Sequence, residues 1–212
     1  MIDQTKWNGP GERPHSYAPD IMAMGDCAIC GHVREAHQIE ARMPRRQGEL
    51  RLDQTVSTAV ISPCGKYRYS LFRRWAEGPT CTFIMLNPST ADEQNDDPTI
   101  RRCIGFAKRE GCGALMVVNM FGYRATDPGD LLLVDDPFGR ENAPTLATAI
   151  ETSNGPVIAA WGAWGPLRQA AKVLADEYPG RLLCLGLTKN GSPRHPLYVK
   201  ADAPLIPFNP KG

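Results

Sequence analysis

The sequence contains no long apolar segment and carries little net charge. No run in its 212 residues approaches the roughly 18 apolar residues of a membrane-spanning helix. The first residues, MIDQTKWNGPGERP, lack the apolar core of a signal peptide, so we expect a cytoplasmic protein with no membrane partner. A formal net charge of +1 argues against a protein that coats nucleic acid by charge alone. It does not exclude a local basic face.

What is present is a globular composition, with 42% hydrophobic and 22% charged residues. The length allows one well-buried domain with an appendage, at roughly 100–200 residues per domain. Residues 1–50 are weakly patterned, and we interpret them as an arm that carries a cysteine and histidine motif. Residues 51–212 form the predicted main domain.

Short apolar runs and helical patterns alternate through the main domain. Two β-prone runs in residues 55–75 flank a turn at 63–66, which predicts a hairpin. The alternation predicts an α/β fold of three layers, with a central, mostly parallel sheet between helices. The expected buried strands are 81–86, 114–121, 156–161 and 181–187, and the expected helices lie within 97–111, 142–153 and 165–180.

Polar side chains follow several of these predicted strands. Open α/β sheets bind ligands beyond the carboxyl ends of their strands, so these residues are the candidates for a site. They are Asn87, Pro88 and Ser89 after one strand, Asn119 and Tyr123 after the next, then Trp161, and His195 in the last loop.

Each candidate also has a structural interpretation. Asn119 interrupts an apolar strand, where its amide either bonds a neighbouring loop or faces the edge of a planar ligand such as a nucleobase. His195 lies between Pro193 and Pro196, a rigid setting that suits catalysis as well as a simple bond to the backbone. The structural interpretation of Asn87 is turn formation. The convergence of all three on one sheet edge favours a site.

The segments MLNPSTAD, DDPTIRRCIGFA, VVNMFGYRAT and PRHPLYV resemble DUF1643, a family of bacterial and phage proteins. The resemblance covers about residues 52–208 and implies no activity.

More distantly, the same landmarks resemble the uracil-DNA glycosylase superfamily. There, one strand ends in a water-positioning Gly-Gln-Asp-Pro or Gly-Ile-Asn-Pro, a later one in a base-reading asparagine, and the last loop reads His-Pro-Ser. This resemblance implies that Asn87 positions a water, that Asn119 reads the base and that His195 stabilises the departing base. Ser89 and Leu197 depart from the superfamily pattern, which puts uracil in doubt as the substrate.

The resemblance therefore implies a glycosylase-like hydrolase for a uracil-like or modified pyrimidine in DNA, in repair or modification, without an organic cofactor. Such an enzyme flips the base out of the duplex. Alternatives are a transferase that modifies a base or nucleotide in the same pocket, and a non-catalytic binder of modified DNA or of a protein. The expected DNA-contacting residues are Arg194, Leu197, Tyr198, Arg101, Arg102 and Lys200.

The N-terminal arm contains a cysteine and histidine cluster, with Cys27, Cys30, His32 and His37 in eleven residues. Such a set suits a tetrahedral zinc ion. His32 lies close to Cys30 in sequence, so His15 or Cys64 is an alternative fourth ligand. We expect a structural zinc ion here, because four protein ligands leave no open position. The acidic residues from Asp92 to Asp97 have no assigned role beyond a helix cap at Asp96 or Asp97.

Overall fold

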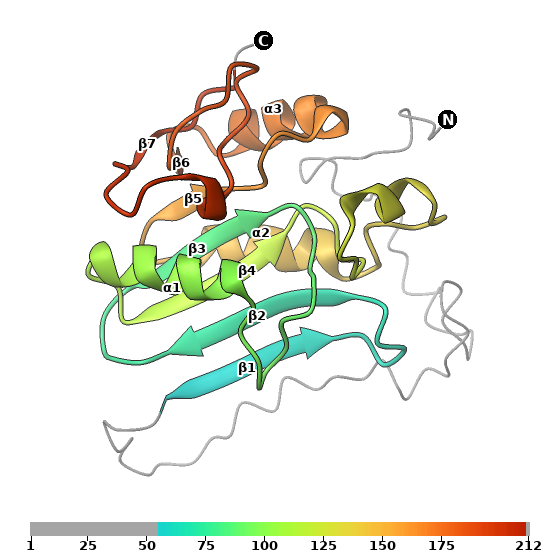
Figure 1. Cartoon of the computed structure of the whole chain (residues 1–212), viewed down its shortest axis with the longest axis horizontal. Helices are drawn as coiled ribbons and strands as arrows, with labels where there is room; N and C mark the ends of the chain where they lie inside the picture. Colours follow the sequence, from blue (N-terminus) through green and yellow to red (C-terminus); the bar gives the residue numbers. More distant parts are fainter. Residues whose placement is uncertain (1–54, 211–212) are drawn as a thin grey trace.

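The computed structural model describes residues 55–210, which form a seven-stranded mixed sheet and three α-helices (Figure 1). The strand order is β1-β2-β4-β3-β5-β6-β7. The strands are β1 (Val56–Ile61), β2 (Arg68–Arg74), β3 (Thr80–Met85), β4 (Ala114–Asn119), β5 (Val157–Ala159), β6 (Leu182–Cys184) and β7 (Ile206–Pro207). The α-helices are α1 (Pro98–Arg109), α2 (Asn142–Glu151) and α3 (Arg168–Glu177), and the 3-10 helices are η4 (Pro128–Leu132), η5 (Gly165–Leu167) and η6 (Pro196–Tyr198).

The centre of the sheet is parallel and its borders are antiparallel. Strands β4, β3, β5 and β6 run parallel, as their continuous apolar sequences predict. The hairpin β1–β2 joins this centre through an antiparallel pairing of β2 with β4, and β7 adds an antiparallel strand at the far border. The α/β class and the hairpin are confirmed, but the sheet is mixed rather than mostly parallel. The hairpin and β7 pair with the two outer strands of the parallel centre, which alternation in the sequence could not reveal.

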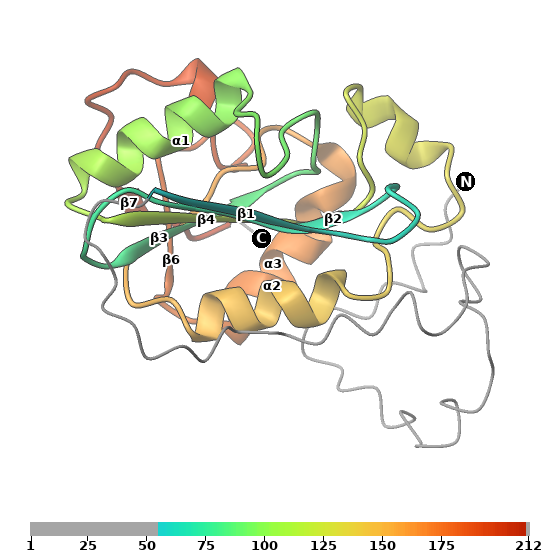
Figure 2. The ribbon, with the colours of Figure 1, turned by 90° about the horizontal axis from the view of Figure 1, so that it is seen from below.

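The helices divide between the two faces of the sheet. Figure 2 shows α1 on one face, and α2 and α3 on the other. On the α1 face, Ile100 and Cys103 pack against strand residues such as Phe83 and Val117. On the opposite face, Leu146 and Leu174 from α2 and α3 pack against residues such as Ile84.

The start of α1 follows from its sequence. The Asp97 side chain accepts a hydrogen bond from the Ile100 amide at 2.8 Å, and Pro98 occupies the first turn, where no amide hydrogen is needed. The expected cap at this position is therefore confirmed for Asp97.

The sequence also favours Asn142 as the cap of α2, but this prediction is wrong, because Asn142 is the first helical residue. Its amide instead donates to the backbone oxygens of Asn119 and Met120, at 3.1 and 3.0 Å. These bonds fasten α2 to the end of β4. No helix within residues 55–210 has the length and apolar character that a membrane crossing requires.

Candidate functional site

The sheet contains a switch point between β3 and β5. The chain leaves β3 through α1 and reaches β4 on one side, whereas β5 lies on the other side of β3 and continues through α3 to β6. Because α1 and α3 cover opposite faces (Figure 2), the connections after β3 and β5 diverge. In open α/β sheets this divergence leaves a crevice at the carboxyl ends of the two strands, where ligands bind.

Asn87 lies two residues beyond β3 and ties two loops together. Its Nδ2 donates to the backbone oxygen of Ala125 at 2.7 Å and to that of Pro88 at 3.0 Å. Two carbonyl acceptors require the amide nitrogen, so the orientation of the side chain is fixed. Within residues 55–210 no donor bonds Oδ1 of this half-buried residue. Asn87 therefore shapes the edge and keeps an acceptor for another group.

Asn119 is the last residue of β4 and is 1% exposed. It is in register with Met85, whose side chain packs on the α1 face, so the Asn119 side chain lies on that face too. Neither Nδ2 nor Oδ1 has a hydrogen-bond partner among the described residues. Each buried polar group without a partner costs roughly 1–3 kcal/mol of stability, so this amide destabilises the fold.

His195 is half-buried in the loop before η6, against the end of β5. A Cβ placed on Gly162 would lie 3.4 Å from the His195 Cβ, so the loop and the β5 end are in close contact. Nδ1 accepts the Leu197 amide hydrogen at 3.3 Å, which puts the proton of a neutral ring on Nε2. Burial lowers the pKa of His195, and the negative charge of Asp97 opposes that shift.

Arg68, at the start of β2, is a member of this edge that the sequence did not reveal. It is 2% exposed; Nη1 donates to the Ala91 oxygen, and Nε has no partner among the described residues. Burial lowers its pKa to about 10, and the carboxylate of Asp97 is the largest opposing influence. Asp97 thus acts electrostatically on both Arg68 and His195. The sequence contained one signal that could have identified Arg68, namely a charged residue between Tyr67 and Tyr69 in a β-prone run.

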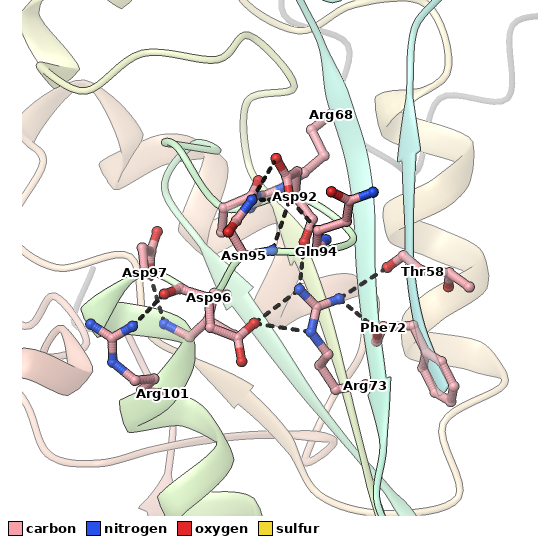
Figure 3. Close-up of polar contacts among 12 residues, drawn as sticks. Thr58, Arg68, Phe72, Arg73, Asp92, Gln94, Asn95, Asp96, Asp97 and Arg101 are labelled. Atoms are coloured by element: carbon pink, nitrogen blue, oxygen red, sulfur yellow. Dashed lines mark hydrogen bonds and ion pairs between the residues drawn. The ribbon is translucent and has the colours of Figure 1, made fainter. Parts of the chain in front are cut away.

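The acidic residues after β3 are held by arginines (Figure 3). Arg73 of β2 donates to Asp96 Oδ1 at 2.9 Å and also to the Asp92 backbone oxygen. The Asp92 carboxylate accepts the amides of Gln94 and Asn95 at 2.8 and 2.9 Å, bonds that lower its pKa. The acidic run is therefore a folded segment, residues 91–97, fastened to β2.

The structure places the expected DNA-contacting residues on two elements. Arg101 and Arg102 lie on α1, and their side chains donate to the backbone oxygens of Asp96 and of Pro196 and Val199, respectively. Arg102 therefore fastens the His195 loop to α1. In that loop Leu197 is 42% and Tyr198 78% exposed, and Arg194 is exposed beside them. The DNA contacts themselves stay a prediction.

The remaining candidates separate into two places. Ser89 and Tyr123 line an open cleft of about 320 Å³ beside the loops after β3 and β4, and Pro88 is buried in the adjoining turn. Trp161 is 3% exposed and packs with the α2 and α3 side of the core, with its ring 5.2 Å from that of Phe208. The structure does not bring Trp161 to the face that carries Asn119.

Comparison with known families assigns the chain to a family. The family model described as protein of unknown function (DUF1643) matches residues 68–197. The chain belongs to the DUF1643 family. No curated protein and no solved structure matched the chain.

The DUF1643 match confirms the family named from the sequence motifs. It begins at Arg68 and ends at Leu197, so it includes Asn87, Asn119 and His195. Strand β1 and residues 1–54 lie outside it. The edge of the sheet described above therefore belongs to the matched part of this DUF1643 protein.

The predicted zinc ligands Cys27, Cys30, His32 and His37 lie outside the described residues, as does His15. Within residues 55–210, no group of three or more histidine, cysteine or acidic side chains is arranged to hold a metal. The alternative ligand Cys64 lies in the β1–β2 turn, with its sulfur 3.3 Å from Ser62 Oγ. Zinc therefore stays a prediction for the arm.

Proposed function

We propose that this DUF1643 protein binds a nucleobase at the carboxyl edge of its sheet and cleaves the N-glycosidic bond of a uracil-like or modified pyrimidine in DNA. The observation that carries the proposal is the unpaired amide of Asn119 at the end of β4. An amide presents donors and an acceptor together, which complements the edge of a pyrimidine. A group that weakens the fold in this way is a candidate for ligand binding.

The base must reach an amide that is 1% exposed. Side chains, rather than strand pairing, hold the segment 91–97 near this face: Arg68 bonds the Ala91 oxygen, and Arg73 bonds Asp96. Ala91 packs in the same cluster as Met85, the register partner of Asn119. We therefore expect this segment to move when a ligand enters.

His195 has the properties needed to stabilise a departing base. Cleavage leaves negative charge on the base, and a neutral imidazole that donates from Nε2 stabilises this charge as it develops. The Leu197 amide occupies Nδ1 and leaves Nε2 as the donor, and the lowered pKa favours the neutral ring near pH 7.

Asn87 supplies the acceptor for the attacking water in this proposal. Its nitrogen is engaged by two carbonyls, so Oδ1 has a fixed direction and accepts a hydrogen bond from water. An amide is a weak base, so the reaction would be slower than with a carboxylate in this position. The resemblance to uracil-DNA glycosylases implies the same three roles for these residues and supports the proposal.

The exposed side chains of the His195 loop suit a duplex substrate. Extrusion of a nucleotide leaves a gap in the stack, and an apolar or aromatic side chain can fill it. Leu197 and Tyr198 are exposed within three residues of His195, and the two rings of His195 and Tyr198 lie 5.6 Å apart. Arg194 would contact a phosphate, which positions DNA without reading its sequence.

The test measures release of free base. Oligonucleotides that contain uracil, 5-hydroxymethyluracil or a hypermodified pyrimidine are incubated with the full chain, and the released base is detected by mass spectrometry. We expect release from at least one of them, and a rate about 10²- to 10³-fold lower for His195→Ala, as for the loss of one oxyanion donor. Asn119→Asp, which exchanges amide donors for acceptors, should also abolish release.

Asn190→Asp is the matched control, since it makes the same chemical change at an exposed position. It should leave the rate unchanged. Absence of release from every substrate, with wild type and His195→Ala alike, would reject the hydrolase. Retained DNA binding without release, insensitive to Asn87→Ala, would favour a non-catalytic binder instead.

A further inference from the structure

The open cleft near Asn87 has a composition that the proposed base recognition does not use. Its volume is about 320 Å³, and it is formed by the β1–β2 turn and by the loops after β3 and β4. Its polar lining consists of two cationic side chains and four hydroxyl groups, with no carboxylate. These residues are Lys66, Arg124, Ser89, Thr90, Tyr123 and Thr126.

Backbone and side-chain bonds hold the three segments of the cleft together. The Arg124 amide donates to the Lys66 oxygen at 2.9 Å, which joins the β4 loop to the hairpin turn. The Ala125 amide donates to the Pro88 oxygen at 2.9 Å, and Asn87 returns a bond to the Ala125 oxygen at 2.7 Å. The cleft is therefore preformed, which lowers the cost of ordering its loops when a ligand binds.

The cleft carries positive charge that no carboxylate of its lining neutralises. Lys66 is exposed and forms no ion pair with any residue between 55 and 210. Arg124 makes a long 3.4 Å bond to the Gly65 oxygen, and its charge contributes to the lowered pKa of Asp92. The Asp92 carboxylate is already engaged by backbone amides of its own loop. The buried Arg68 adds a third positive charge, near Arg124.

We propose that this cleft binds a phosphate group of the ligand, with Lys66 and Arg124 as the charged donors and the hydroxyl groups as additional ones. The inference rests on the proposed function in one respect: the phosphate belongs to the nucleotide whose base Asn119 reads, or to the DNA backbone beside it. The loops after β3 and β4 carry both features, since Ser89 follows Asn87 by two residues and Tyr123 follows Asn119 by four. Lysine and arginine with hydroxyl groups are the side chains that recognise phosphate in proteins.

The test compares ligands with and without phosphate. Dissociation constants are measured by calorimetry for deoxyuridine, its 5′-monophosphate, inorganic pyrophosphate and a single-stranded oligonucleotide that contains deoxyuridine. In wild type we expect the monophosphate or the oligonucleotide to bind about 10- to 100-fold more tightly than the nucleoside, as for charge-assisted hydrogen bonds. Lys66→Gln/Arg124→Gln should remove this difference and leave nucleoside affinity unchanged.

Lys108→Gln/Lys172→Gln is the control, because it removes two positive charges from exposed positions on α1 and α3. It should keep the wild-type preference for phosphate. A gain seen with the monophosphate identifies a nucleotide phosphate as the occupant, whereas a gain seen only with the oligonucleotide identifies the DNA backbone.

Two outcomes separate this inference from the proposed function. If pyrophosphate binding depends on Lys66 and Arg124 while no ligand depends on Asn119, the phosphate site stands and base recognition fails. If the double variant binds every ligand as wild type does, or if no phosphate-bearing ligand binds, the phosphate site is overturned.

Discussion

Arg73 of β2 donates to Asp96 Oδ1 at 2.9 Å, so a residue of the sheet holds the segment that leads into α1. The Arg73 side chain is 5% exposed and that of Asp96 is 28% exposed. Arg73 also donates to the backbone oxygens of Thr58 and Phe72, at 3.4 and 3.0 Å. One guanidinium thus connects β1, β2 and the acidic segment (Figure 3).

Arg73→Met should lower the free energy of unfolding by about 1–3 kcal/mol, because it removes a buried guanidinium and leaves several part-buried acceptors without a donor. Asp96→Asn should cost less, since an amide oxygen still accepts. Arg74→Met is the control: the Arg74 bond to the Ala76 oxygen is exposed, so its loss should cost no more than about 0.5 kcal/mol. Chemical denaturation measures the stability of all three variants. Equal stability of the two arginine variants would contradict the role of Arg73 in holding the acidic segment.

Asn119→Leu should leave the free energy of unfolding unchanged or raise it by up to about 1 kcal/mol, because it replaces unpaired polar atoms with apolar ones. It should also abolish base binding. Asn142→Leu provides the contrast, since it removes two bonds to the end of β4 and should cost about 1–3 kcal/mol. A large loss for Asn119→Leu would indicate a structural asparagine.

The free energy of unfolding should fall as the pH decreases below the pKa of an exposed histidine, 6.5. Burial lowers the pKa of folded His195 below the value of 6.5 that it has when exposed. Between these two values the unfolded chain binds a proton that the folded one does not, so acid favours unfolding. The stabilisation is complete above pH 6.5 and is lost as the pH falls through the folded pKa.

The His195→Asn variant should lack this pH-dependent part of the free energy of unfolding. Melting curves between pH 5 and pH 8 should therefore converge at low pH when the variant is compared with wild type. A constant difference across this range would show that His195 does not titrate abnormally.

Gly139→Ala should destabilise the protein more than Gly111→Ala. Both glycines have positive φ angles, 75° and 72°, where alanine is strained by about 1 kcal/mol. A Cβ on Gly139 would also lie 2.5 Å from Cδ1 of Tyr67, whereas a Cβ on Gly111 meets nothing within 4 Å. The difference between the two free energies of unfolding therefore measures the contact with Tyr67, and equal losses would argue against it.

The N-terminal arm should bind zinc. Elemental analysis of the purified full chain should give one equivalent of zinc, and Cys27→Ser/Cys30→Ser should lose it, because thiolates are the preferred ligands. Cys81→Ser/Cys103→Ser is a control with buried thiols whose pKa values are raised by burial. Metal-free wild-type protein would end this prediction.

The sequence predicts the centre of the fold well because buried strands and amphipathic helices leave strong patterns. The runs ending at Asn87 and Asn119 form β3 and β4, and both asparagines lie at one edge as expected. The helix after Asp97 begins where its cap and proline indicate. These features depend on neighbours in the sequence, so local reasoning finds them.

Other features depend on neighbours in space. Arg68 lies in a strand that pairs with β4 across 40 residues or more, and nothing near it in sequence shows that Ala91 and Asp97 lie close to it. The antiparallel pairing of the hairpin with β4 was hidden for the same reason. Trp161 follows β5 as a site residue would, but the alternation of the strand turns it to the other face.

The anchoring of Asn87 also constrains how this lineage can evolve. Its nitrogen faces two carbonyl oxygens at 2.7 and 3.0 Å, and a carboxylate in the same place would repel both. An aspartate at this position, one base change away in the genetic code, would have to displace the backbone at Pro88 and Ala125. The backbone of these two loops, and not chemistry alone, thus keeps an amide at the end of β3.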